Sequence, residues 1–543
     1  MRLLLLLTLL AFTDTASAQG GSVVGHVRSD GAPVPFATVS VQGSTRARGT
    51  AADPEGRYRL AGLAPGRYML VASSVGYASQ ARTVTVAAGR TDTLDFELAE
   101  AAFESEGITV TATMQEQRVS ESPVRVQIIQ PQVFERVPTV NLMDAIENVN
   151  GLRQQVDCGV CGTNSIRING MDGPYTAVLI DGMPIMSSLA AVYGLNGISP
   201  SIIQQVEVVK GPMSTLYGSE ALAGVVNVIT KNPATAPAVS VHTFGTEDGE
   251  YAVDAAIARQ RGRYAGLLSA TAFDNRRFLD KNGDGFSDLV LTRRLALFGK
   301  ATRTGHLGLP VAGLAVKLYD EHRRGGVRDF VRDDRRYQGS NQVYGERIAT
   351  RRFEATAFAG RPGGARLEGA FNVHHQDAFY GPTPYDAHQT TAFVQASRPS
   401  RLGRVALLTG AALRYNEYDD NTAATPSADR RFVPGAFMQA EADAMPGVRL
   451  LGGLRADHEE DYGVVVSPRA SLRFRRHENT TLRANFGTGF RIVNLFTEDH
   501  AAYTGARATV VLERLRPERS VAGTLSLQQI VPMGRDVLTL DAD

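Results

Sequence analysis

Two stretches decide the fold of this chain: IRINGMDGPYTAVLIDGMPI (residues 166–185) and, after an insert, IIQQVEVVKGPMSTLYGSEALAGVVNVITK (residues 202–231). They contain short apolar-rich runs at residues 166–169, 177–180 and 206–209. Pairs that favour tight turns stand beside these runs: Asn169-Gly170, Asp172-Gly173 and Asp181-Gly182. Short apolar runs bounded by such pairs predict β-strands joined by tight turns.

The order of these elements, above all residues 206–231, closely resembles the plug domain of TonB-dependent outer-membrane receptors. In that family, a plug fills a large β-barrel and admits scarce ligands when an inner-membrane partner pulls on it. The resemblance implies a plug at residues 114–233 and a barrel at residues 234–543. The expected fold class is therefore mainly β: an N-terminal β-sandwich, an α/β plug and a transmembrane antiparallel β-barrel.

The charge balance and the N-terminus limit the function classes. The chain has 543 residues, of which 57 are basic and 56 acidic, so its formal net charge is +1 and we expect no nucleic-acid partner. Residues 1–18 are typical of a secretory signal peptide, because Arg2 and a short apolar run precede Ala16-Ser17-Ala18. No later segment approaches the roughly 20 apolar residues of a membrane helix, so a membrane form would have to be a barrel.

The first part of the mature chain, residues 19–98, has short β-prone runs separated by turn pairs such as Asp30-Gly31 and Pro65-Gly66. This spacing predicts a small β-sandwich. Four stretches resemble the carboxypeptidase regulatory-like domain: residues 32–39, 53–58, 63–68 and 75–77. Despite its name, this module is not catalytic and often precedes the plug, which implies a periplasmic location.

Residues 99–113 are expected to be a linker that carries the TonB box. The candidate TonB-interacting residues are Ile108, Thr109, Val110, Thr111 and Ala112. A flexible, extended segment can add as a strand to the sheet edge of a partner, and backbone hydrogen bonds then carry a pull. The alternative interpretation is that these residues are simply the first strand of the plug.

From about residue 238 onward, apolar and polar residues alternate. In the stretch 365–373, Leu367, Phe371 and Val373 share one face, whereas Arg366, Glu368 and Asn372 share the other. This period of two is typical of transmembrane barrels. At on the order of 20 residues per strand and connection, about 300 residues allow roughly 14 or 15 strands, and a plugged barrel of this class has about 22. We therefore expect a barrel that is incomplete at its C-terminal end.

Cys158 and Cys161 precede the strand at residues 166–169, in a loop that the resemblance places at the outer, ligand-facing apex of the plug. Three interpretations stay open. A disulfide is favoured by an oxidising compartment. A soft-metal site, for copper for example, would use the thiolates and the nearby thioether of Met171. The third interpretation is a purely steric role.

A second candidate site spaces oxygen ligands like the start of a calcium loop, with Gly285 at the turn position. The candidate ligands are Asp280, Asn282, Asp284 and Asp288. Leu291 stands where an EF-hand has Glu, which excludes an EF-hand and leaves a shorter Ca²⁺ loop or a solvated turn. We expect no required cofactor, with Ca²⁺ as the candidate ion.

The pair His374-His375 is followed by Asp377 and His388, which suggests a metal or haem site. Adjacent histidines on a strand point to opposite faces, so these two cannot share one ligand. We therefore favour the interpretation that they form no site.

No catalytic set is present, because the nucleophile-elbow, zinc-protease and phosphate-loop motifs are absent, and we expect no enzyme. The function that the resemblance implies is TonB-dependent import, across the outer membrane, of a siderophore or other metal chelate, haem, cobalamin or copper. The partners would be TonB with its inner-membrane energising complex, outer-membrane lipid and the ligand. The alternative is an outer-membrane binding or adhesion protein that uses the sandwich. Candidates for the plug–barrel polar network are Arg167, Glu207, Lys210 and Arg491.

Overall fold

A computed structural model describes residues 20–41, 49–74, 77, 80–98, 108–109, 111–130, 133, 142, 146, 149–184, 189, 197–305, 310–361, 363–477, 479–493, 512–513, 515–533 and 536–543. The signal peptide predicted at residues 1–18 lies outside them. The chain forms two compact units, one made of Met1–Ser105 with Ile530–Thr539 and the other of Glu106–Gln529 with Leu540–Asp543.

The first unit contains the predicted β-sandwich. One sheet is built on β1, which pairs with β2, β5, β8 and β9, and the other has the order β4-β3-β6-β7. The strands are β1 (Gly21–Ser29), β2 (Ala32–Pro33), β3 (Thr38–Val41), β4 (Gly49–Ala51), β5 (Arg57–Leu63), β6 (Gly66–Ser73), β7 (Gln80–Val86), β8 (Thr91–Thr93) and β9 (Phe96–Glu97). Alternate residues of β1 are buried, and Val23, Val27, Leu70 and Phe96 form part of one core. The period of two thus places one face of each sheet inward.

The plug contains a five-stranded sheet of order β12-β17-β18-β15-β16, in which β15 and β18 run parallel. Its strands are β12 (Gln127–Ile129), β15 (Thr176–Ile180), β16 (Met183–Pro184), β17 (Ile203–Lys210) and β18 (Gly224–Thr230). A separate hairpin joins β13 (Leu152–Cys158) to β14 (Thr163–Ile168). Two one-turn elements, η3 (Pro200–Ile202) and α4 (Ser214–Tyr217), flank β17. The α/β character predicted for the plug is confirmed.

Two of the three predicted turns have the expected backbone. Asn169 and Asp181 have φ values of 52° and 49°, and each is followed by a glycine with positive φ. Successive left-handed residues match the twist of a two-residue hairpin turn, which explains the Asn-Gly and Asp-Gly pairs. At the third pair, Asp172-Gly173, the predicted tight turn is present, because the Tyr175 N–H donates to the Asp172 carbonyl at 3.0 Å, but its backbone is right-handed. Gly173 begins the 3₁₀ helix η1 (Gly173–Tyr175), because Pro174 fixes a helical φ in its first turn.

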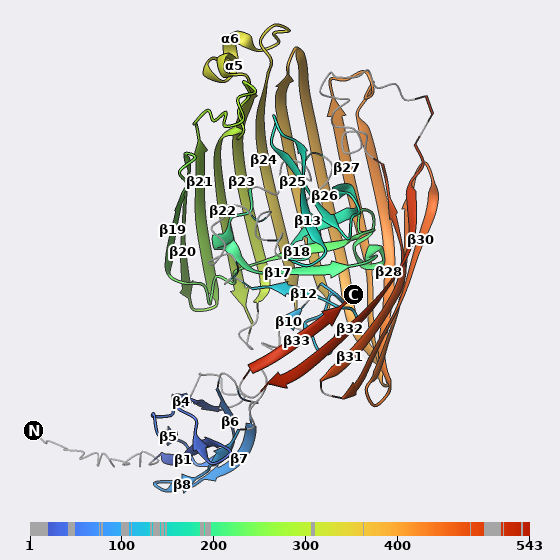
Figure 1. Cartoon of the computed structure of the whole chain (residues 1–543). Helices are drawn as coiled ribbons and strands as arrows, with labels where there is room; N and C mark the ends of the chain where they lie inside the picture. The colour runs from blue at the N-terminus through green and yellow to red at the C-terminus, as the bar shows by residue number, and fades with distance from the viewer. Residues whose placement is uncertain are drawn as a thin grey trace, which may run out of the picture. The chain divides into compact units, whose positions relative to one another are not determined.

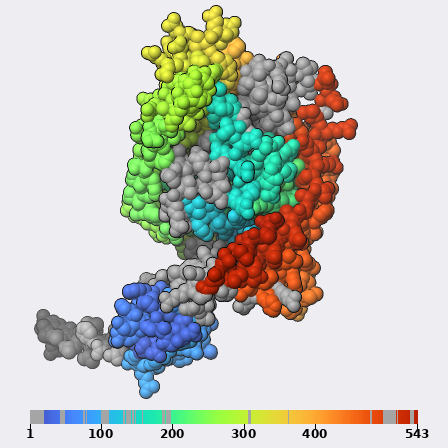
Figure 2. Space-filling view, in the orientation of Figure 1, coloured from blue at the N-terminus to red at the C-terminus, as the bar shows by residue number. Residues whose placement is uncertain are grey.

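A 15-stranded sheet with strands in sequence order makes up the described part of the barrel, in agreement with the predicted 14 or 15 strands. Figure 1 shows this sheet curving around the plug strands β13, β17 and β18, and Figure 2 shows plug atoms filling the enclosed space. The strands are β19 (Val239–Gly245), β20 (Glu250–Arg261), β21 (Tyr264–Asn275), β22 (Leu291–Thr304), β23 (Pro310–Gly326), β24 (Gly345–Gly360), β25 (Arg366–Tyr380), β26 (Thr383–Leu402), β27 (Val405–Asp420), β28 (Asp429–Met445), β29 (Val448–Glu459), β30 (Gly463–His477), β31 (Thr480–Arg491), β32 (Glu518–Met533) and β33 (Asp536–Ala542).

The two faces of the barrel sheet have the reverse polarity of a soluble protein. On β25, Leu367 and Phe371 are 53% and 42% exposed. The polar residues Asn372 and Gln376, which lie on the opposite face of the same strand, are almost completely buried. An apolar outer face and a polar inner face are what a sheet in lipid requires. The alternation predicted for residues 365–373 is thus confirmed.

The two ends of the barrel differ in the length of their connections. At one end, β26–β27 and β28–β29 are joined by two-residue turns, at residues 403–404 and 446–447. At the other end, β23–β24 are joined by residues 327–344, which include α5 (Arg328–Arg332) and α6 (Asp334–Tyr337). Outer-membrane barrels have short periplasmic turns and long extracellular loops. This asymmetry identifies the α5–α6 end as the outer end.

Candidate functional site

The segment predicted to bind TonB lies inside the plug unit rather than free. Ile108–Thr109 (β10) pairs with Gln117–Arg118 (β11) in a two-stranded ladder. The side chains of Thr109, Thr111 and Ala112 are completely buried, and Val110 lies outside the described residues. The expected flexible, extended segment is therefore a docked one. The alternative, that these residues are the first strand of the plug, agrees with β10 being the first strand of this unit, although β10 pairs with β11 and not with the five-stranded plug sheet. Binding of TonB to this segment stays a prediction.

A single buried carboxylate holds this segment. Glu207, on β17, is completely buried and accepts hydrogen bonds on Oε2 from the hydroxyls of Thr109 and Thr111, both at 2.6 Å, and from the backbone N–H of Thr111 at 2.9 Å. Its Oε1 accepts from Gln205 Nε2 at 2.8 Å. A buried carboxylate is costly unless donors surround it, and bonds to a charged acceptor are the stronger kind. The two threonines therefore stabilise the docked segment through their hydroxyls.

Two further plug side chains bond to Thr111. Asn227 Nδ2 donates to its hydroxyl at 2.8 Å, and the Tyr217 hydroxyl donates to its carbonyl at 2.9 Å. Burial, reinforced by the charge of Glu207, raises the pKa of Tyr217, so its hydroxyl keeps its proton and remains a donor. Thr111 is thus held by three different side chains from β17, α4 and β18.

The chain that follows is tied to the barrel wall by four arginines of β29, β30 and β31, termed here the arginine row: Arg449, Arg469, Arg473 and Arg483. Each donates to a backbone carbonyl of the plug. The acceptors are Ala112 for Arg469 (2.8 Å), Ser120 for Arg473 (2.7 Å), Glu121 for Arg449 (3.3 Å), and both Ser122 (3.0 Å) and Val119 (3.2 Å) for Arg483. The row thus attaches residues 112–122 to the wall.

The register explains how these cations gather. Arg449 and Arg483 are both cross-strand partners of Arg473, close to the short-turn end of the barrel. Like charges directly opposite each other repel, so the row needs acceptors. Carbonyl oxygens of the plug segment supply them, and Asp443 pairs with Arg449 at 2.7 Å. Sequence reasoning missed these arginines, because nothing local identified their partners in the plug.

The four residues predicted for the plug–barrel network differ in the partners that they contact. Arg167 pairs with Asp172 within the plug, and Glu207 bonds within the plug as described above. Lys210 Nζ lies 3.6 Å from a carboxylate oxygen of Asp543. Arg491, on the barrel strand β31, contacts Tyr175 of the plug. Arg167 and Glu207 are predicted to contact the barrel. The contacts described here for them are with residues of the plug unit instead: Asp172 for Arg167, and the segment at residues 109–111 for Glu207.

Arg491 Nε binds Glu518 Oε2 at 3.0 Å on the neighbouring strand, and its guanidinium lies 4.8 Å from the ring centre of Tyr175 in the plug. The Tyr175 hydroxyl donates to the other oxygen of Glu518 at 3.2 Å. Sequence reasoning missed a further plug–barrel ion pair, in which Lys300 Nζ lies 2.9 Å from Asp181 Oδ2. Arg491 is buried and Glu518 is about one third exposed, whereas Lys300 and Asp181 are both mostly buried.

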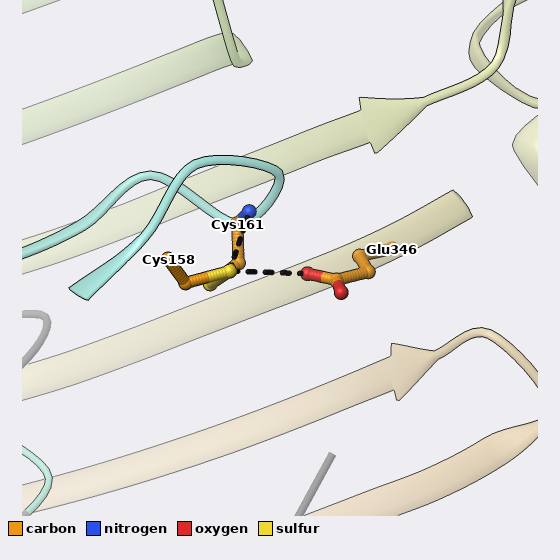
Figure 3. A group of neighbouring side chains, drawn as sticks. All are labelled: Cys158, Cys161 and Glu346. Atoms are coloured by element: carbon orange, nitrogen blue, oxygen red, sulfur yellow. Dashed lines mark hydrogen bonds between the residues drawn. A yellow bond between two sulfur atoms is a disulfide. The ribbon is translucent and has the colours of Figure 1, made fainter. Parts of the chain in front are cut away.

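The apex of the plug is the tip of the β13–β14 hairpin, where Cys158 and Cys161 form a disulfide (Figure 3). Glu346, at the outer end of β24, has a carboxylate oxygen 3.8 Å from Cys158 Sγ. Arg323 of β23 donates to the Gly162 carbonyl at 2.7 Å, which fixes the hairpin tip to the wall. Of the three interpretations left open for the cysteines, the structure shows the disulfide.

Met171 does not join the cysteines. Cys158 pairs with Thr163 at the hairpin tip, whereas Met171 bridges to Ile168, five residues further along β14. At about 3.3 Å per residue, this places Met171 roughly 17 Å from the tip. The prediction of a mixed thiolate–thioether site is therefore wrong for Met171.

Tyrosines of the barrel wall surround the disulfide. Cys161 packs in one cluster with Tyr380, Tyr385 and Tyr418, all buried. The hydroxyls of Tyr385 and Tyr418 lie 2.8 Å apart, and Tyr418 donates to Asp420 at 2.7 Å. The apex is thus packed against buried aromatic and carboxylate side chains near the outer end of the barrel.

A pocket lies between the plug and the wall formed by β26–β29 and β31. Among its lining residues are Arg414, Arg431 and Arg455 from the wall and Glu220 from the plug. Burial raises the pKa of Glu220, and the charges of Arg414 and Arg491 act in the opposite direction. Asp429 and Asp457 pair with two of the arginines at 2.8 and 2.7 Å, so the pocket combines strong donors with a polar rim.

The predicted calcium ligands serve as turn-forming acceptors. Asp280 accepts from the N–H groups of Gly283 (2.8 Å) and Gly285 (3.1 Å), and Asp288 accepts from that of Lys281 at 2.6 Å. Asn282 and Asp284 accept backbone N–H groups two residues on. These bonds account for the residue pattern as a solvated turn, and calcium binding there stays a prediction.

Comparison with known proteins identifies the three parts of the chain. The family model "TonB-dependent Receptor Plug Domain" matches residues 118–225, "Carboxypeptidase regulatory-like domain" matches 22–99, and "TonB dependent receptor-like, beta-barrel" matches 241–542. The last of these covers more than half of the chain.

Two curated relatives are similar over most of this chain. The vitamin B12 transporter BtuB of Vibrio vulnificus (strain CMCP6) is 24% identical over 396 residues, which are 71% of this chain and 63% of the relative. The ferric enterobactin receptor of Pseudomonas aeruginosa is 26% identical over 471 residues, 72% of this chain and 61% of the relative. The chain thus spans a little over three fifths of the length of these relatives.

Solved structures share the fold. The siderophore receptor PirA from Pseudomonas aeruginosa matches with a TM-score of 0.55 at 19% identity, over 74% of this chain and 72% of that chain. The FrpB iron transporter from Neisseria meningitidis matches with a TM-score of 0.58 at 15% identity, over 75% and 70%.

Among the described helices, none has the length and apolar character needed to cross a bilayer. The matched plug, the matched barrel and the inward-polar, outward-apolar sheet agree with one another. The chain belongs to the TonB-dependent receptor family of outer-membrane proteins.

Proposed function

We propose that this protein is an active transporter that binds an anionic metal chelate at its outer face and is opened by a TonB pull on residues 108–112. The observation that carries the proposal is the two-stage attachment of the plug's first segment. Glu207 holds Thr109 and Thr111, and the arginine row holds residues 112–122.

This arrangement suits a pull applied from the periplasm, because the attachments follow one another along the chain. Tension at residue 108 would load the Glu207 bonds first and the arginine row next. Hydrogen bonds to charged groups contribute about 1.5–3 kcal/mol each, and bonds loaded one after another resist less force than bonds loaded together. Release of residues 108–122 would free β11 and then reach β12, an edge strand of the plug sheet.

The lumen pocket supports a proposal for the ligand class. Arg414, Arg431 and Arg455 on one wall provide planar donor groups of the kind that match carboxylate or catecholate oxygens. Arg431 and Arg455 already pair with Asp429 and Asp457. The relatives are named for vitamin B12, ferric enterobactin and siderophores. Of the expected ligands, an anionic ferric chelate suits the arginines of this pocket. Free copper is less suited to the chain, because the two cysteines that could bind it at the apex are joined in a disulfide.

We further propose that the sandwich lies in the periplasm and that binding and transport, rather than catalysis, are the protein's task. No enzymatic step is needed for this account. TonB, its inner-membrane complex and the outer-membrane lipid are the proposed partners.

The test is an uptake survey in cells that express the chain, with and without TonB. The labelled probes are a ferric catecholate, haem, cobalamin and copper. The proposal expects TonB-dependent uptake of the ferric catecholate, and R414A is expected to weaken its binding while an exposed control, R351A, leaves it unchanged. Binding of the probe without any TonB-dependent uptake would overturn the transport proposal. If that binding also disappeared on deletion of residues 22–98, the adhesion alternative would replace it.

A further inference from the structure

The outer wall of the barrel carries a cluster of side chains that the transport proposal does not use. His375 on β25 and His388 on β26 are direct cross-strand partners, and their rings stack with centroids 4.2 Å apart at an interplanar angle of 5°. Asp386 lies two residues before His388 and therefore on the same face of the sheet. Its two oxygens lie 3.0 Å from His375 Nε2 and 3.2 Å from His388 Nε2.

We propose that His375, Asp386 and His388 form a binding site for a divalent transition-metal ion, of the class of Zn²⁺, on the outside of the barrel. One ligand atom from each residue lies within 4.8 Å of the others. A tetrahedral zinc site has metal–ligand distances of about 2.0–2.2 Å, which places neighbouring ligand atoms roughly 3.3 Å apart. The two nitrogen–oxygen distances already have that size. The rings are stacked, so binding an ion requires them to turn until both nitrogen lone pairs point to it.

The donor set selects the kind of metal. Imidazole nitrogens suit zinc, copper and nickel, whereas calcium and magnesium prefer oxygen ligands alone. Three protein ligands leave one tetrahedral position for water or another small ligand. The backbone beneath the site is a continuous antiparallel ladder from Arg366–Ser397 to Tyr380–Thr383, so the ion would not have to order the chain.

The site is accessible and separate from the transport path. The side chains of His375, Asp386 and His388 are 34%, 49% and 61% exposed. They share the outer face with Phe371 and Leu367, whereas His374 points inward and is completely buried. The site lies five residues from the outer β25–β26 turn, beyond the apolar residues Phe371 and Leu367 on the same strand. A metal bound here faces the membrane surface rather than the lumen.

His374 and His375 point to opposite faces of the sheet, as expected, so they cannot share a ligand. The expectation that no site forms considered only this adjacent pair. The second imidazole comes from the neighbouring strand. Only the register, which pairs His375 with His388, shows this.

The experiment measures metal binding to the purified full chain in detergent, carrying an affinity tag without histidines and kept oxidised. Titration calorimetry with Zn²⁺ and the visible spectrum of bound Co²⁺ are the readouts. We expect one site, whose affinity falls by at least about tenfold in H375A and in H388A, since even residues that only orient a ligand contribute that much. D386N, which preserves shape, is expected to change the Co²⁺ spectrum.

The matched control is H322A. His322 also pairs with an aspartate on the outer wall, Asp320 at 3.4 Å, but the described groups of three metal-ligating side chains do not include this pair. Binding that is unchanged in the double variant H375A/H388A, or binding that is lost equally in H322A, would overturn the proposal. Heat-modifiable migration on gels verifies that each variant keeps its barrel. Uptake of the ferric chelate is expected to be unchanged in H375A/H388A, so failure of this site and failure of the transport proposal are distinguishable.

Discussion

Replacing Glu207 by glutamine is expected to release the segment at residues 108–112 from the plug while the barrel stays folded. The substitution keeps the size of the side chain and removes its charge. Three donors from this segment bond to the carboxylate, from Thr109 Oγ1, Thr111 Oγ1 and the Thr111 N–H. A bond to a charged acceptor exceeds a neutral one by about 1 kcal/mol, so the docked state should lose about 3 kcal/mol. Since 1.4 kcal/mol is a factor of ten, the population of the released segment should rise about a hundredfold.

Hydrogen–deuterium exchange of peptides that cover residues 108–118 measures this release. E207Q should lower the protection of this segment by about two orders of magnitude and leave the amides of β15 and β18 unchanged. The matched control is E121Q, which removes a carboxylate from the same plug segment. The backbone carbonyl of Glu121 accepts a hydrogen bond from Arg449, and its carboxylate acts on Arg449 and Arg473 through its charge alone. Equal protection in E207Q and the unmodified protein would refute the role of Glu207 as the anchor, and equal loss in E121Q would show a general charge effect.

Three further predictions follow from the site. The double variant R473A/R483A removes three hydrogen bonds to plug carbonyls and should loosen the plug. Cells that express it should then admit a large antibiotic more readily, and unchanged permeability would contradict the anchoring role of the arginine row. Reduction of the Cys158–Cys161 disulfide should create a Cu(I) site with Glu346 that competes with a copper chelator, whereas the oxidised protein and C158S/C161S should not compete. R414A should raise the Kd for a ferric catecholate more than about tenfold and leave that for an uncharged ligand unchanged, because a bidentate arginine contact discriminates by charge.

Local sequence patterns predicted the fold well in two cases: where a residue pair determines the backbone of a turn, and where the two-residue period of apolar side chains determines which face of a strand meets lipid. The turns at Asn169-Gly170 and Asp181-Gly182 need left-handed residues, and those pairs supply them. The barrel strands alternate with a period of two because lipid covers one face and the plug covers the other. Resemblance of residues 206–231 to a known plug added the arrangement of these parts.

Contacts between distant parts of the chain were beyond such reasoning. The carbonyl of Ala112 and the guanidinium of Arg469 are separated by 357 residues, and only the register of the barrel brings them together. The same holds for His375 and His388, which neighbouring strands place opposite each other. Met171 shows the converse, since closeness in sequence to Cys161 did not bring it to the hairpin tip.

The most direct test of the account is a pulling experiment on single molecules. The barrel is held in a supported membrane, and force is applied through the C-terminal domain of TonB. The account predicts a first release of about 75 Å, the extended length of the 22 residues from Ile108 to Ile129, with plug and barrel otherwise intact. E207Q and R473A/R483A should lower the force of this step. Unfolding of the whole plug in one event, or a first step that neither variant changes, would contradict the claim that this segment is the attachment on which TonB acts.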